Sequence, residues 1–220
     1  MINLEEIRGE SRLIDEALSG QLRDVLKPLQ RAVELRAVVD LSREKDRELA
    51  LFLKKLTGLS EQLSLRLYAP QEAAAAAPEL STAWLPVTGL YLDNAYGRMA
   101  FHGVPGGKEI NALVLALRNL AGPGQEVAEP LLARIEAIDR PLKLQVCVSL
   151  ACAHCQKVVS ACQLIAAHNL QVQADMIDAS LYRDLVERYQ IERVPLLLAN
   201  GEVLCLGEKS LADILNRLGV

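Results

Sequence analysis

The sequence is poor in aromatic residues and carries no surplus of positive charge. Aromatics make up only 4% of its 220 residues, so the core must be built mainly from Leu, Val, Ile and Ala. The formal net charge is -4, whereas proteins that bind nucleic acid or a membrane surface usually present a basic face. We therefore expect neither kind of partner. With 51% apolar and 24% charged residues, the composition is typical of an ordinary globular protein.

The sequence also has no segment typical of a signal peptide or a membrane span. It begins MINLEEIRGE, which is acidic and polar where a signal peptide would be basic and then apolar. The apolar run ALVLAL is far shorter than a membrane span. We therefore expect a cytoplasmic protein, in which thiols are normally kept reduced. The odd count of five cysteines also argues against a framework of permanent disulfides.

Hydrophobic periodicity predicts alternating helices and strands along the first half of the chain. The stretch between Pro70 and Pro78 is rich in alanine, and we predict a surface loop there, although five alanines could form one helical turn. A polar turn around Asn94 and Gly97 should join two of the strands. The patterns predict helices over residues 3–18, around 49–56 and around 110–117, and strands over 32–41, 63–69, 84–93 and 97–104.

The stretch AGPGQ, residues 121–125, breaks this pattern because adjacent Gly and Pro interrupt regular structure. It marks the predicted boundary between a first domain, 1–121, and a second, 122–220. Both halves have the order βαβ followed by ββα, which predicts an α/β fold class with two related folds in tandem. In the second half we expect helices over 126–139, from the cysteine pair onward, over 181–190 and from 210, with strands over 142–150, 170–178, 194–200 and 203–208.

The stretch VSLACAHCQKVV, residues 148–159, contains a Cys-x-x-Cys pair at the start of a predicted helix. The helix macrodipole and the free backbone N–H groups at this end favour a thiolate, so we expect a depressed pKa for Cys152. Cys155 shares a predicted buried face with Val158, Val159 and Cys162. We therefore predict that Cys152 is the nucleophile and Cys155 the resolving thiol.

His154 stands between the two cysteines and is the predicted pKa-tuning residue. If protonated, it would stabilise the Cys152 thiolate by Coulomb attraction and make the disulfide more oxidising. A structural zinc site and a chemically inert pair remain alternatives to redox chemistry. Zinc, however, needs four ligands, and the three histidines show no zinc-type spacing, so we predict no metal site. The other cysteines are expected to be small core residues: Cys147, Cys162 and Cys205.

Pro195 precedes the apolar run LLLAN and is a second candidate site residue. An X-Pro bond in a tight bend before a strand is a candidate for the cis form. In the functional interpretation, Pro195 lies against the cysteine pair and excludes metals, and the Val194 backbone pairs with a bound substrate strand. The alternative is an ordinary proline at the start of a strand.

These features resemble the thioredoxin fold. The chain is similar over nearly its full length to the N-terminal domain of the flavoprotein subunit of bacterial alkyl hydroperoxide reductase. The similar segments are KPLQRAVELRAVVDLS, FHGVPGGKEINALVLAL, VSLACAHCQKVV, MIDASLYRDLVERYQIERVP and NGEVLCLGEKSLADIL. The resemblance implies two tandem thioredoxin-like folds, each with a central mixed sheet flanked by helices, of which only the second is redox-active. In the first half, Leu41-Ser42-Arg43 replaces the cysteine pair and Pro86 corresponds to Pro195.

The resemblance implies an electron relay whose redox centre is the Cys152–Cys155 disulfide, with no bound cofactor. The donor would be a flavin-dependent disulfide reductase, and the acceptor a peroxiredoxin or another disulfide-containing protein. It also places an acidic residue of the inactive half, here Glu109, near the pair, where its carboxylate could move the proton of Cys155. A solvated glutamate in the first turn of a helix is the alternative.

Three features depart from the family pattern. Gln156 replaces a proline after the second cysteine, Ala153-His154 replaces His-Asn, and the alanine-rich stretch is unusual. No G-x-G-x-x-G motif occurs, so the flavin- and nicotinamide-binding portion is missing, and the chain is either a free-standing shuttle or a piece of a longer protein. A different class of function also stays open, namely a tandem adaptor that binds a partner while its thiols are incidental.

Overall fold

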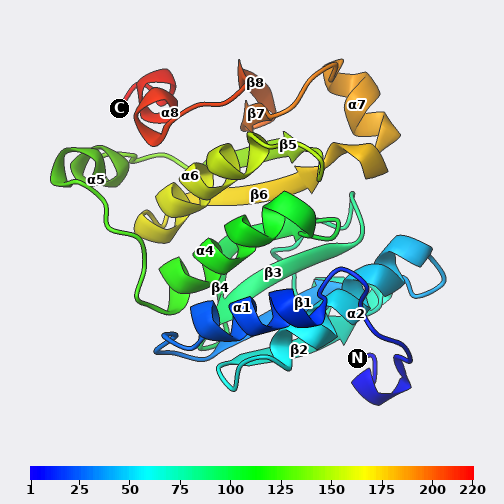
Figure 1. Cartoon of the computed structure of the whole chain (residues 1–220). Coiled ribbons are helices and arrows are strands. Elements are labelled where there is room, and N and C mark those ends of the chain that lie inside the picture. Colours follow the sequence, from blue (N-terminus) through cyan, green and yellow to red (C-terminus); the bar gives the residue numbers. More distant parts are fainter.

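The computed structural model describes residues 1–220, and the first half of the chain supplies four strands. These strands are β1 (Val33–Val38), β2 (Leu63–Tyr68), β3 (Val87–Leu92) and β4 (Ala95–His102) (Figure 1). The helices of this half are η1 (Leu4–Glu6), α1 (Glu16–Leu26), α2 (Glu44–Thr57), η2 (Pro70–Glu72), α3 (Ala73–Ala76), η3 (Gly107–Glu109) and α4 (Ile110–Ala121), where η denotes a 3₁₀ helix.

The second half supplies four more strands in the same order of elements. Its strands are β5 (Leu142–Val148), β6 (Val172–Asp178), β7 (Leu196–Ala199) and β8 (Glu202–Leu206). Its helices are α5 (Glu129–Glu136), α6 (Cys155–His168), η4 (Ala179–Leu181), α7 (Arg183–Tyr189) and α8 (Leu211–Leu218). None of the helices of the chain is both long enough and apolar enough to cross a membrane.

All eight strands form one mixed sheet in the order β2-β1-β3-β4-β6-β5-β7-β8. Within each half, two strands pair in parallel through a crossover helix, β1 with β2 and β5 with β6. The other two strands of each half form an antiparallel hairpin. The parallel pairing of β4 with β6 joins the halves. The predicted α/β class, with a mixed sheet flanked by helices, is confirmed.

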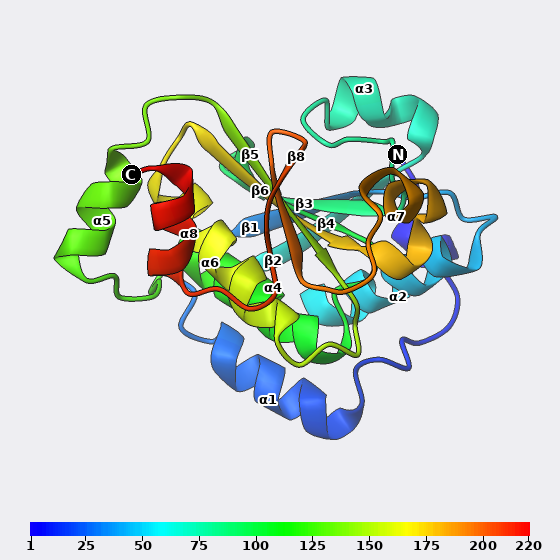
Figure 2. The ribbon, with the colours of Figure 1, turned by 90° about the horizontal axis from the view of Figure 1, so that it is seen from above.

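Helices cover both faces of this sheet (Figure 2). The main core lies on the face that carries α1, α2, α4, α6 and α8. Two smaller clusters lie on the opposite face, one beneath α3 and one beneath α7. The active-site helix α6 therefore packs in the same layer as α4, which belongs to the other half of the chain.

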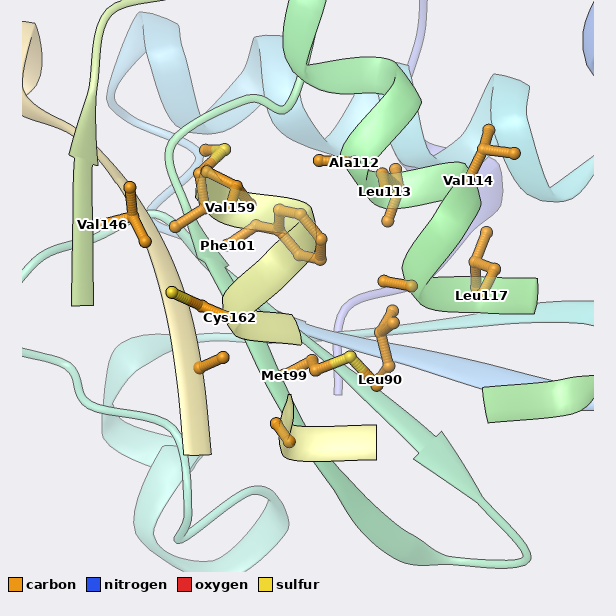
Figure 3. Packing of buried hydrophobic residues seen from close by; sticks show 14 of the residues in the cluster. Leu90, Met99, Phe101, Ala112, Leu113, Val114, Leu117, Val146, Val159 and Cys162 are labelled. Carbon is orange, nitrogen blue, oxygen red and sulfur yellow. The ribbon is translucent and has the colours of Figure 1, made fainter. Parts of the chain in front are cut away.

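The main core runs through the junction between the halves without interruption. Phe101 of β4, Leu113 of α4 and Val159 of α6 are at most 1% exposed and lie in this shared core (Figure 3). Burial of such side chains typically contributes about 1.5–3 kcal/mol each. The predicted division at 121/122 falls between α4 and α5 and remains a prediction, because one sheet and one core extend across it.

The position of β5 explains how the cysteine pair is held. This strand lies inside the sheet between β6 and β7, and all its residues except Lys143 are buried. Strands that are covered on both faces are typically near-continuous apolar runs, as in LKLQVCV. The carboxyl end of β5 leads directly into the cysteine pair and α6, so the pair stands on a rigid part of the fold.

Two sequence predictions at the start of the chain need correction. The helix predicted over 3–18 is wrong, because only the 3₁₀ turn η1 forms before Glu16. The side chain of Asp15 accepts a hydrogen bond from the Leu18 N–H and so caps a helix that begins later. Ile7 and Ile14, which suggested one helical face, are buried from irregular chain instead.

Two turn predictions also differ from the structure. The alanine-rich stretch is not all loop, because η2 and α3 form there and Ala73 and Ala77 are buried; the helical-turn alternative is right. The hairpin turn consists of Asp93 and Asn94, which both have positive φ, and Gly97 lies within β4. A Cβ at Gly97 would lie only 2.8 Å from a methyl group of Leu120, so glycine allows α4 to approach the strand.

Candidate active site

The two cysteines of the motif form a disulfide. Their Cα atoms are 5.7 Å apart, within the usual range for a disulfide. Cys152 lies in the turn after β5, where its N–H donates a hydrogen bond to the carbonyl of Ser149. Cys155 is the first residue of α6. The local sequence thus places one sulfur just before the helix and the other in its first turn.

The two sulfurs differ in their exposure as predicted. Cys155 is completely buried and belongs to the main core together with Val158, Val159 and Cys162. Cys152 is only partly buried and lies at the edge of that core. A partner can therefore reach Cys152 directly, while Cys155 is reachable only by an attack from within the chain.

The amino terminus of α6 is electropositive. This 14-residue helix has no acidic residue in its first turn, and the side chain at its N-cap, His154, makes no capping hydrogen bond. The free N–H groups and the macrodipole at this end stabilise negative charge. After reduction of the disulfide, this environment favours a thiolate at Cys152.

The bend before β7 places a backbone carbonyl beside the pair. The Val194–Pro195 peptide is cis, and the Val194 carbonyl oxygen lies 3.9 Å from the Cys152 sulfur. The N–H of Gly207 donates to the Pro195 carbonyl at 2.8 Å, which ties this bend to the end of β8. The predicted location of Val194 and Pro195 is confirmed. Their roles in substrate binding and metal exclusion remain predictions.

Glu109 is the one acidic group that the first half contributes beneath α6. It ends η3, which packs against α6, and it is fully buried with no hydrogen-bond partner for either carboxylate oxygen. Burial, together with the charge of Asp178, raises the pKa of Glu109 to about 7. The alternative of a solvated glutamate is therefore wrong. A buried carboxyl group with this pKa is suited to exchange protons at neutral pH.

His154 is largely exposed and pairs with a carboxylate that no sequence motif indicates. Its Nδ1 atom contacts the Glu208 carboxylate, and the Lys157 Nζ atom binds the other oxygen of Glu208 at 2.6 Å. These two bonds, led by that from Lys157, hold the pKa of Glu208 below its ordinary value. No pattern in the sequence links positions 154 and 208, so only the fold reveals this contact.

The corresponding place in the first half holds an arginine. Leu85–Pro86 is a second cis peptide, and the guanidinium of Arg43 donates to the Leu85 carbonyl at 3.2 Å. Arg43 is also the N-cap residue of α2, as His154 is of α6. The first half therefore keeps the loop geometry of the site without a sulfur, as its sequence predicted.

The remaining three cysteines are buried in the core, as expected. Cys147 lies in β5, Cys162 in α6 and Cys205 in β8. Burial raises the pKa of Cys147 to about 12 and raises the pKa of Cys162 even further. Such thiols stay protonated at neutral pH and are poor nucleophiles. No group of three or more His, Cys, Asp or Glu side chains is arranged to hold a metal ion.

Comparison with known proteins agrees with this geometry. A family model for the thioredoxin domain matches residues 142–218. The crystal structure of the NTD_N/C domain of alkylhydroperoxide reductase AhpF from Enterococcus faecalis has a TM-score of 0.87 and 33% identity, and the match covers 93% of this chain and 99% of that one. The chain belongs to the family of AhpF N-terminal domains. A further structure of the Enterococcus faecalis protein has a TM-score of 0.86 and 31% identity, covering 94% of this chain and 100% of that one.

Among curated proteins, the alkyl hydroperoxide reductase protein AhpF of Pseudomonas aeruginosa is 30% identical over 206 residues. The match covers 94% of this chain but only 37% of that protein, so the chain spans little more than a third of its length. The AhpF-like fold and the disulfide of Cys152 and Cys155 make the chain a thiol-disulfide oxidoreductase.

Proposed function

We propose that the chain relays electrons from a flavin-dependent disulfide reductase to the disulfide of a peroxiredoxin or another disulfide protein. One observation carries this proposal. The reachable sulfur of Cys152 lies between the amino terminus of α6 and the Val194 carbonyl, with the buried Cys155 bonded behind it. The chain needs no bound cofactor for this task, because the disulfide itself carries two electrons. We place the relay in the cytoplasm, where other thiols are also kept reduced.

The first step is attack by the reduced pair on its partner. The Cys152 thiolate attacks one sulfur of the partner disulfide, a new S–S bond forms, and the old one breaks. The partner's second sulfur leaves as a thiolate. The adjoining Val194 backbone is placed to pair with an extended segment of the partner and to align the three sulfurs in a row.

The second step releases the partner. Cys155 loses its proton, and its thiolate attacks the Cys152 sulfur, which reforms the internal disulfide and expels the partner's remaining thiolate. Glu109 is suited to take that proton, because its carboxyl group titrates near neutral pH and η3 packs against α6. The partner has gained two electrons, and the chain is oxidised. A reductase dithiol then restores the reduced pair by the reverse sequence.

A trapping experiment tests this proposal. Cys155→Ser should accumulate a covalent adduct with an oxidised peroxiredoxin, because the mixed disulfide forms and no resolving thiol follows. Cys152→Ser should form none, since the buried Cys155 cannot be reached. The adduct is detected on non-reducing gels and located by mass spectrometry. Partner binding that survives in Cys152→Ser, with no exchange in the unmodified chain, would support the adaptor alternative instead.

A further inference from the structure

The Glu208 carboxylate bridges two cationic side chains at the amino terminus of α6. One oxygen contacts Nδ1 of His154, the residue between the cysteines, and the other accepts from the Lys157 Nζ atom at 2.6 Å. Glu208 is about one-third exposed, whereas His154 and Lys157 are about two-thirds exposed. The acidic group is thus the more enclosed member of this triad and lies directly over the first turn of the helix.

The backbone fixes Glu208 at this place. It follows Gly207, whose N–H binds the Pro195 carbonyl, and so it is anchored to the bend that touches Cys152. Two residues later, Ser210 caps α8. The segment between β8 and α8 passes beside α6 (Figure 2). The carboxylate is therefore held by both sides of the active site and does not depend on a flexible loop.

The other charged groups near this segment are engaged elsewhere. The Lys209 Nζ atom donates to the carbonyls of Leu206 and Glu208, and Asp213 accepts from Ser210. Arg217 makes no ion pair, and Glu109 lies buried beneath α6. Glu208 is thus the acidic side chain that pairs with the exposed cations at the amino terminus of α6.

We propose that Glu208 is a positioning residue that sets the reduction potential of the Cys152–Cys155 pair by neutralising His154 and Lys157. Without this carboxylate, both cations would stabilise the Cys152 thiolate, and a stabilised reduced form makes a disulfide more oxidising. With it, the net positive charge beside the sulfur is reduced and the pair is a better electron donor. This inference rests on the proposed redox function and deepens it.

The test compares Glu208→Gln with the unmodified chain. Redox equilibrium with glutathione gives the potential, and the pH dependence of Cys152 alkylation gives its pKa. We expect the equilibrium constant to shift by about threefold toward the reduced form, which is about 15 mV for a two-electron couple. The pKa of Cys152 should fall in parallel. Both effects should shrink at 1 M salt, because the triad is partly exposed to solvent.

Two comparisons make the result decisive. Glu202→Gln removes the same charge from the start of β8, where Glu202 is exposed and makes no ion pair, and it should leave the potential unchanged. In a His154→Asn, Lys157→Gln background, Glu208→Gln should lose its effect. An unchanged potential in Glu208→Gln, or an equal shift in Glu202→Gln, overturns the inference. Absence of any redox transition in the unmodified chain would instead overturn the proposed function.

Discussion

The Cys152 sulfur lies 3.9 Å from the carbonyl oxygen of Val194, a residue 42 positions further along the chain. Two loops therefore meet at the reactive sulfur, one at the end of β5 and one before β7. In thiol-disulfide exchange the attacking sulfur must be accessible, while the resolving sulfur is best shielded from solvent and foreign thiols. The contact defines a one-sided approach to the pair, and it leads to specific expectations for the individual residues.

Reduced protein should be alkylated selectively at Cys152. Cys152 is partly exposed beside an electropositive helix end, whereas Cys155 and the three structural cysteines are buried. With one equivalent of iodoacetamide at pH 7, we expect modification of Cys152 to exceed that of any other cysteine by on the order of tenfold. Peptide mass spectrometry measures the ratio. Equal labelling of Cys155 under native conditions would contradict the assigned roles.

Glu109→Gln should slow the release of the partner mainly above pH 7. The pKa of Glu109 is raised to about 7, so its basic form is populated above that pH and absent well below it. Loss of a general base typically lowers a rate by about 100-fold or more, and partial replacement by solvent would reduce this to about tenfold. The measurement is the rate of disulfide reduction between pH 6 and 8.5. A variant whose pH profile matches that of the unmodified chain would exclude the proton-transfer role.

The same substitution should affect stability with the opposite sign. Since the folded-state pKa of Glu109 lies above its ordinary value, the neutral form favours folding at low pH, and this contribution is lost as pH rises from about 4.5 through 7. Above pH 7, Glu109→Gln should therefore raise the free energy of unfolding by up to about 3 kcal/mol relative to the unmodified chain. Urea unfolding at pH 5 and pH 8 measures the difference. The exposed Glu136→Gln serves as the control, with no such dependence expected.

Two glycine substitutions should change stability in opposite directions. A Cβ at Gly97 would lie 2.8 Å from a Leu120 methyl group and 3.0 Å from the Leu90 carbonyl oxygen, so Gly97→Ala should lower the free energy of unfolding by about 1–3 kcal/mol. Gly20 lies in α1 with no atom within 4 Å of such a Cβ. Gly20→Ala should raise stability by about 0.5–1 kcal/mol. Thermal or urea unfolding of both variants checks the signs.

Most of the regular structure could be predicted because its hydrophobic patterns are strong. The strands and the helices α2, α4 and α6 follow period-2 and period-3.6 burial with little ambiguity. The amino-terminal helix was misplaced because Ile7 and Ile14 are buried by tertiary packing from irregular chain, which periodicity cannot distinguish from a helical face. The register between the halves rests on the pairing of β4 with β6, and no local signal specifies it.

The site was predictable to the extent that its residues are close in sequence. Cys152 and Cys155 belong to one motif, and the burial of Cys155 followed from its helix face. The location of Pro195 needed the order of elements, and that of Glu109 needed a family resemblance. Glu208 had no such signal, because an exposed Glu before a Lys is ordinary in sequence, and only the fold places it over His154.

The guanidinium of Arg43 occupies, in the first half, the loop carbonyl that is still free to face a sulfur in the second. Duplicated scaffolds of this kind offer two equivalent openings, yet here one of them is already closed by the protein's own side chain. Incoming disulfides are thereby confined to a single doorway, and a molecule with twofold architecture performs its chemistry one partner at a time.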